Sequence, residues 1–328
     1  MKYLFLILVL SLASPSSFAH SGKHLKKGVN IVTWWDYLTS KSLEPVERAC
    51  DVKIYFDEYY SNAEFQRKVE ANDYDIAIYS DNISKDIRLL TTSIIDLKNE
   101  FLPSYPQSVR ALSDSLDNNS AFFMFAFTGL LWNPDNISLS PTDGIRDIFS
   151  KAEDKLVLIL DEHAVAFDLL RQAGLADSNP EQLHNLRKLL AGSYAVISSN
   201  LGRLYQADNF ALAYVWSGEA LSLISDENLN YQFLLHPSIS HMAFDQLTLL
   251  DNSEASVCVA RYLASEKFTK GVSERTKYFS PYSIDRVLSS SPVVPRKPLH
   301  LENSYFLKSQ RVWASVKMSI NPRMKVKP

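Results

Sequence analysis

The sequence predicts an α/β protein whose two lobes enclose a hinged cleft between two mixed sheets. Apolar, β-branched stretches alternate with helical patterns from residue 29 onward, and the same alternation starts again at residue 156. Such alternation is typical of strand–helix–strand units with mostly parallel sheets. Two long apolar segments, near 121–128 and 240–248, lie outside this alternation. We expect them to run from one unit to the other, which leaves a cleft between the lobes.

The first unit is predicted from three short apolar stretches separated by amphipathic segments. Strands are expected at residues 29–34, 52–56 and 74–80. Thr39 or Ser40 can cap the first helix, and residues 61–64 form a capping box that opens the second. A further helix is expected near 82–90. The order of these elements favours parallel pairing of the three strands.

The second unit begins after the most apolar internal run, residues 121–127, which predicts a core strand. We expect that strand to end in a turn containing Gly129 and Trp132-Asn133-Pro134. Further strands are expected at 156–160, 194–198, 210–216 and 231–235. Helices are expected over 162–173 and 304–318, from Pro180, and after Ser253. The Ser/Pro-rich residues 289–300 predict a connector.

The composition and the short motifs of the chain exclude several classes of function. The chain has 328 residues, about two domains at roughly 150 residues each. Its 34 Lys and Arg against 37 Asp and Glu give a net charge of -3, which argues against nucleic-acid binding. Gly-rich phosphate loops are absent, as are the G-x-S-x-G, S-x-x-K and H-E-x-x-H motifs. We therefore expect a binding protein with no catalytic residues, no cofactor and no metal, rather than an enzyme.

Residues 1–19 predict a secretory signal peptide with cleavage after Ala19. Lys2 precedes an apolar run of about ten residues, and small residues lead into the expected cleavage site. The run is short for a membrane span, which needs about 20 residues. We expect an exported protein.

Two cysteines, Cys50 and Cys258, have no partner that the sequence can assign. In an oxidising compartment they could form a disulfide. Both lie in apolar helical patterns, so two buried free thiols are the alternative.

Aromatic and acidic side chains stand where the predicted strands end. Ligands of open α/β sheets bind at the carboxyl ends of the strands. The candidate ligand-binding residues are Trp34, Asp36, Tyr37, Ser80, Asp81, Asp161, Trp216, Asp245 and Tyr278. Carboxylates bind ammonium groups by charge-assisted hydrogen bonds, and a cation over an aromatic face adds about 0.5–2 kcal/mol. The set predicts a site for a flexible organic cation with apolar spacers.

Each of these residues also has a simpler explanation. A single Trp or Tyr is more often part of a core than of a ligand site. An Asp directly after a strand, such as Asp161, often only caps the next helix. The convergence of several aromatic and acidic strand ends is what favours a binding site.

Several segments, in order along the chain, resemble one protein family. They are TWWDY, YYSNAEF, YDIAIYS, TGLLWNPD, FALAYVWSGEA, HMAFDQLTLL and KYFSPYS. They are similar to motifs of the periplasmic spermidine/putrescine-binding proteins, the substrate-capturing components of ABC importers. The resemblance implies a type II periplasmic binding protein fold, a periplasmic location, a polyamine ligand and an inner-membrane ABC permease as partner, with the protein itself mostly monomeric.

The resemblance also implies roles for individual residues. Trp34 and Tyr37 would be aromatic walls, with Ser80 and Asp81 as polar contacts from the first lobe. Asp161 would bind a terminal amine and Asp245 a second or internal amine. Trp216 would stack on the methylene chain and Tyr278 would close the side of the cleft.

The chain departs from the family pattern at four places, Thr33, Tyr79, Ala164 and Ala243, of which the last two mark where the expected site is weakest. Ala164 stands where the family often has an acidic residue, for which Glu162 is the candidate substitute. Ala243 stands where the family has an aromatic residue, with Phe244 adjacent. Two alternatives therefore stay open: a binding protein for another small cationic or polar solute, and a sensing or adaptor protein not tied to import.

The two lobes are expected to be discontinuous in sequence. Lobe 1 is predicted to comprise residues 20–124 and 246–295. Lobe 2 is predicted to comprise residues 125–245 and 296–328. Under this division the chain passes between the lobes three times, and two of the passages lie within apolar segments.

Overall fold

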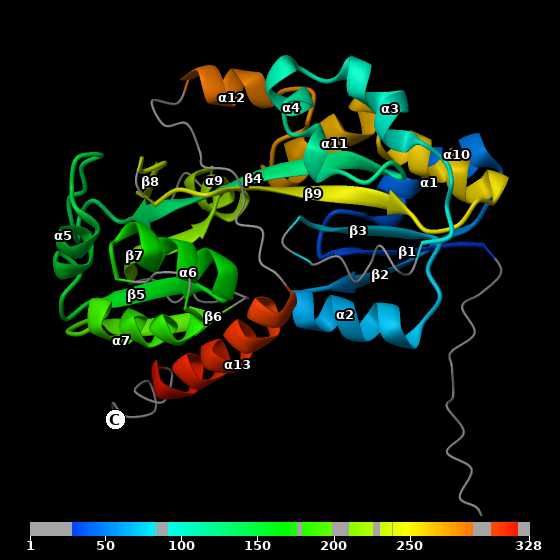
Figure 1. Cartoon of the computed structure of the whole chain (residues 1–328). Coiled ribbons are helices and arrows are strands. Elements are labelled where there is room, and N and C mark those ends of the chain that lie inside the picture. Colours follow the sequence, from blue (N-terminus) through cyan, green and yellow to red (C-terminus); the bar gives the residue numbers. More distant parts are fainter. Residues whose placement is uncertain are drawn as a thin grey trace, which may run out of the picture.

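The computed structural model describes residues 28–81, 83, 91–175, 179–198, 210–225, 230–237, 239–290 and 303–320. The predicted signal peptide, the predicted helix near 82–90 and most of the predicted connector lie outside the described residues. Within the described residues, two groups of strands flanked by helices meet along one pair of long strands, β4 (Ser120–Trp132) and β9 (Met242–Leu249) (Figure 1).

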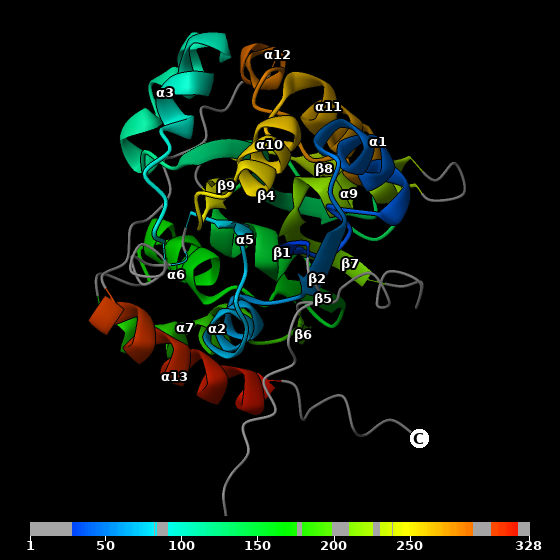
Figure 2. The same ribbon diagram turned by 90° about the vertical axis from the view of Figure 1, so that its right-hand side faces the viewer.

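The first group contains the three predicted parallel strands. They are β1 (Val29–Trp34), β2 (Ile54–Tyr59) and β3 (Ile76–Ser80), in the order β2-β1-β3. The helices of this group are α1 (Ser40–Cys50), α2 (Asn62–Ala71), α3 (Leu97–Phe101), α4 (Gln107–Arg110), α10 (Glu254–Leu263), α11 (Glu266–Thr276) and α12 (Ile284–Ser290). Helix α2 lies on one side of the sheet, and α1, α10 and α11 lie on the other (Figure 1, Figure 2).

The predicted caps set the starts of the first two helices. Thr39 and Ser42 form a reciprocal capping box at α1, and the Ser61 side chain accepts a hydrogen bond from the Glu64 backbone at α2. Leu43 and Val46 of α1 are buried against the sheet. The local sequence therefore determines where the helices that follow β1 and β2 begin.

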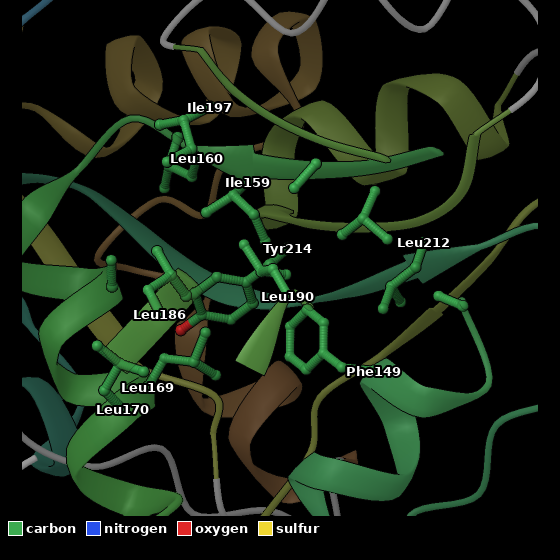
Figure 3. Packing of buried hydrophobic residues seen from close by; sticks show 14 of the residues in the cluster. Phe149, Ile159, Leu160, Leu169, Leu170, Leu186, Leu190, Ile197, Leu212 and Tyr214 are labelled. Carbon is green, nitrogen blue, oxygen red and sulfur yellow. The ribbon is translucent and has the colours of Figure 1, made fainter. Parts of the chain in front are cut away.

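The second group contains β5 (Leu156–Leu160), β6 (Tyr194–Ser198), β7 (Phe210–Trp216) and β8 (Gln232–Leu234). Its helices are α5 (Ile145–Ser150), α6 (His163–Gln172), the 3₁₀ helix η4 (Pro180–His184), α7 (Asn185–Leu189), α9 (Ser217–Ile224) and α13 (Asn303–Ile320). Buried Phe149, Ile159, Leu169, Leu212 and Tyr214 belong to its core (Figure 3). Where Pro180 predicts a helix, the chain forms one 3₁₀ turn and then a short α-helix.

Strands β4 and β9 connect the two groups. Residues 120–127 of β4 pair with β9, and residues 128–132 pair with β7. All thirteen residues of β4 are buried. The two sheets expected from the sequence are therefore linked into one hydrogen-bonded path, β2-β1-β3-β9-β4-β7-β5-β6, with β8 paired to β4.

Gly129 corrects one sequence-based expectation, because it lies inside β4 rather than in a turn. A Cβ atom at this position would stand 2.5 Å from Cζ of Phe233 in the neighbouring β8. The glycine allows β8 to approach β4 closely, a known use of glycine within strands. The turn begins only after Trp132, at Asn133 and Pro134.

Cys50 and Cys258 form a disulfide with Cα atoms 5.8 Å apart, within the usual range. The bond joins the end of α1 to α10. Of the two alternatives that the sequence left open, the structure shows the disulfide.

Candidate ligand site

The end of a strand in the first group and the end of a strand in the second group face each other. Asn62 opens α2 just after β2, and Glu162 follows β5. The Asn62 side-chain amide donates a hydrogen bond to Glu162 Oε2 at 2.9 Å. This contact bridges the strand ends of the two groups, which is where the sequence places the ligand site.

Asp245 is the buried carboxylate of the first group. It lies in β9 directly opposite Ser80, the last residue of β3, and only 7% of the residue is exposed. Ser80 Oγ donates to Asp245 Oδ1 at 2.5 Å, and the Tyr37 hydroxyl donates to Oδ2. Trp34 Nε1 donates to Ser80 Oγ at 3.0 Å. The sequence-predicted residues Trp34, Tyr37, Ser80 and Asp245 thus form one hydrogen-bond network.

In the part of the chain that the structure describes, every side chain that hydrogen-bonds Asp245 is neutral. No Lys or Arg of the described residues forms an ion pair with it. Burial raises the pKa of the Asp245 carboxyl above its ordinary value, and hydrogen bonds from Ser80, Tyr37 and Trp34 oppose that shift. An ionised carboxylate in such a place is costly without a cation. Within the described residues, a negative charge on Asp245 therefore has no cation to balance it.

Asp36 and Tyr278 border this network. Asp36 takes a left-handed backbone conformation, with φ of 67°, and its side chain is half-exposed. Burial raises the pKa of Asp36, while the Arg275 guanidinium, with Nε 3.9 Å from Asp36 Oδ1, opposes the shift. Arg275 Nη2 also donates to the Asp36 and Tyr37 carbonyls, at 3.0 and 2.7 Å. Asp36 therefore already has the Arg275 guanidinium beside it, and it lies at the edge of the hydrogen-bond network around Asp245.

Tyr278 connects the first group to α9. Its ring meets Tyr37 edge-on, with centroids 5.9 Å apart. A Cβ atom on Gly218 of α9 would stand 2.7 Å from the Tyr278 ring, so the ring lies directly on that helix backbone. Burial raises the pKa of the Tyr278 hydroxyl well above its ordinary range, and the nearby Glu219 carboxylate adds to the shift. Tyr278 thus lies between Tyr37 of the first group and the backbone of α9, and its role in closing a ligand cleft stays a prediction.

The remaining predicted residues lie apart from this network. The Asp81 backbone N–H donates to the Phe244 carbonyl at 2.9 Å, which holds the end of β3 against β9. Trp216 ends β7 as the N-cap of α9 and is partly buried against the core of the second group.

Asp161 follows β5 and is bound by α13. Trp313 Nε1 donates to Asp161 Oδ1 at 2.6 Å, and Lys317 Nζ donates to Oδ2 at 2.7 Å. The structure thus places Asp161 and Trp216 on the second group, and the other predicted site residues on the first.

The sequence reasoning missed three residues of the site region, Asn62, Trp313 and Lys317. Trp313 and Lys317 are four residues apart in one helix and therefore lie on the same face. That spacing could have shown that they act together. Nothing local could have shown that their target is Asp161, more than 150 positions earlier in the chain.

The described residues contain neither a membrane-spanning helix nor a cluster of metal-ligating side chains. None of the described helices is both long and apolar enough to cross a membrane. The same residues contain no group of three or more His, Cys, Asp or Glu side chains placed to hold a metal ion.

Comparison with known proteins gives matches in structure but not in sequence. No protein-family model matches the chain, and no curated protein sequence matches it. A chain described as a spermidine/putrescine ABC transporter from Listeria monocytogenes superposes with a TM-score of 0.71 at 16% identity, covering 89% of this chain and 99% of that one. The spermidine/putrescine substrate-binding protein PotD from Streptococcus pneumoniae gives 0.68 at 16% identity, with the same coverage.

A solved structure with a different ligand also shares the fold. The binding protein MotA of A. tumefaciens, in complex with glucopine, superposes with a TM-score of 0.63 at 11% identity, covering 88% of this chain and 99% of that one. The named neighbours are binding proteins or components of transporters rather than enzymes. The chain therefore has the mixed α/β fold of the solute-binding proteins of ABC transporters.

Proposed function

We propose that the protein is an exported solute-binding protein that captures a small organic cation, most specifically a polyamine such as putrescine or spermidine, and delivers it to an ABC permease. The observation that carries this proposal is Asp245, a buried carboxylate whose hydrogen-bond partners among the described residues are all neutral. An ammonium group would complete its charge balance. Trp34, Tyr37 and Tyr278 surround it with aromatic surface suited to methylene groups and cations.

Capture would use the two strands that connect the groups. The lobe boundaries proposed from the sequence, after residues 124 and 245, fall within β4 and β9. Bending of these strands would open the Asn62–Glu162 contact and admit the ligand. A closed, liganded state would then be what the permease recognises.

Calorimetry of the exported chain with putrescine, cadaverine, spermidine and spermine tests this proposal. We expect saturable binding of at least one of these amines and a thermal shift that grows with its concentration. The Asp245→Asn variant serves as the control that removes the charge but keeps the shape. Absence of both heat and thermal shift with all four amines would refute polyamine binding.

A further inference from the structure

The C-terminal helix supplies a cation of its own to the site region. Lys317 Nζ lies 2.7 Å from Asp161 Oδ2, and Trp313 Nε1 holds the other oxygen at 2.6 Å. The Asp161 side chain is 18% exposed and that of Lys317 is 32% exposed. Both oxygens of this carboxylate therefore have a partner from α13, and one of these partners is an alkyl ammonium group.

This pair lies on the edge of the second group that faces the first. Asp161 directly follows β5, and its neighbour Glu162 reaches across to Asn62. The parallel pairing of β5 with β7 ends at Ile159 and Tyr214, and extending the same register by two residues brings Asp161 level with Trp216. Lys317 thus carries its charge to the strand end beside Trp216, where a ligand between the lobes would find its second anchor.

The spacing of the two carboxylates follows from the strand registers. Along β4, Asp245 is opposite Met124 and Trp216 is opposite Thr128. At about 3.3 Å per residue, the two levels are roughly 13 Å apart along the strand, with further separation across the sheet. A ligand that reached both carboxylates would be an extended molecule with an ammonium group at each end.

We propose that Lys317 acts as a tethered substitute for a ligand amine, so that the protein recognises one ammonium group, at Asp245, and gains little from a second. This inference rests on the proposed function and refines its ligand class: a polyamine would bind through one of its ammonium groups, and a monoamine of equal length would bind nearly as well. A second ligand ammonium would have to displace a cation held in place by its own helix, whose effective concentration at Asp161 exceeds that of a free ligand.

Matched monoamines and diamines test the inference. Binding of 1-butylamine, putrescine, 1-octylamine and 1,8-diaminooctane is measured by calorimetry for the wild type and for Lys317→Met. For the wild type we expect each diamine to bind within about threefold of the monoamine of equal length. In Lys317→Met the Asp161 carboxylate loses its cation. We therefore expect the affinity for 1,8-diaminooctane to rise about tenfold or more, while the affinity for 1-octylamine stays unchanged.

Two further variants separate recognition from helix packing. Lys317→Arg keeps the positive charge and should retain the wild-type preference. Asp161→Asn combined with Lys317→Met removes both charges and should abolish the gain for the long diamine. The indole N–H resonance of Trp313 gives an independent readout, because it should shift on addition of 1,8-diaminooctane to Lys317→Met and not to the wild type.

The possible failures are distinguishable. If no amine binds the wild type or any variant, the proposed function fails, and the inference fails with it. If amines bind but the diamine-to-monoamine ratio is the same in the wild type and in folded Lys317→Met, cation capture survives and the role of Lys317 is refuted. A wild type that already prefers 1,8-diaminooctane tenfold over 1-octylamine refutes the same role.

Discussion

Asp245, inside β9 opposite the end of β3, and Asp161, just after β5, are both carboxylates, yet their partners in the fold are of opposite kinds. Asp245 is buried among the hydroxyls of Tyr37 and Ser80 and has no cation of its own among the described residues. Asp161 is held by an indole N–H and an ammonium group from α13. A carboxylate at a strand end is therefore not by itself a candidate ligand contact, because the partners already present decide whether its charge is available.

The largest expected effect comes from removing the available charge. Asp245→Asn should weaken amine binding by about tenfold to a hundredfold, since a charge-assisted hydrogen bond contributes about 1.5–3 kcal/mol. Asp161→Asn should change monoamine affinity less than threefold. Calorimetry on the two variants side by side measures the contrast, and equal losses would contradict the distinction between the carboxylates.

Trp216→Ala should weaken binding of long-chain amines by about tenfold, because it removes a large apolar face beside the second strand edge. Trp35 supplies a matched control, since it follows β1 but is 56% exposed. Trp35→Ala should leave amine affinity within about twofold. Titrations with 1-octylamine compare the two variants, and the reverse order of effects would place the apolar contact at the rim instead.

The same two carboxylates should affect stability in opposite directions. Burial raises the folded-state pKa of Asp245, so its proton stabilises the fold below the ordinary pKa of 3.8, and that stability is lost as pH rises through the raised value. Asp245→Asn should therefore gain in Tm relative to wild type as pH increases from 3.5 to 7, without ligand. A Tm difference that does not change with pH would contradict this linkage.

Asp161→Asn should instead lower stability at neutral pH, by about 1 kcal/mol, because the partly exposed Lys317 loses its ion pair. Urea unfolding of the wild type and the variant at pH 7 measures this change. Lys317→Met in the Asp161→Asn background should cost little more, since the two residues share one interaction. Additive losses from the two substitutions would show that they act independently.

The smallest expected effect concerns the hydrogen bond between Asn62 of the first group and Glu162 of the second. Asn62→Ala removes the hydrogen bond to Glu162 and should weaken ligand affinity by about two- to fivefold through a less stable closed state. Because the variant leaves Asp245 and its partners intact, the loss should be similar for monoamines and diamines. A loss confined to diamines would instead assign Glu162 to direct ligand contact.

Local sequence signals predicted most of the fold. The bounds of β1, β5, β6 and β7 follow from apolar runs between polar or turn-forming residues, and the caps at Thr39 and Ser61 determine the helix starts. The extent of β4 could not be predicted, because Gly129 serves a contact with Phe233 that only the tertiary structure shows. Trp34, Tyr37, Ser80 and Asp245, which the sequence proposes as site residues, share one hydrogen-bond network, and their role in ligand binding stays a prediction.

The partners of Asp161 depend on a different kind of information. The sequence predicts the C-terminal helix, and its side chains Trp313 and Lys317 share one face. Which surface that face covers is decided by packing between segments far apart in the chain. Pairing between such segments leaves no periodic pattern in a single sequence, so the neutralisation of Asp161 had to be seen in the structure.

The disulfide between Cys50 and Cys258 has a consequence for the topology of the whole chain. Both cysteines belong to helices of the first group, and the chain between them leaves that group, builds β5 to β8 and returns through β9. The chain from Cys50 to Cys258 and the disulfide between them therefore form a covalently closed ring. A protease that cuts once anywhere within the ring leaves both fragments joined, and they separate only after reduction.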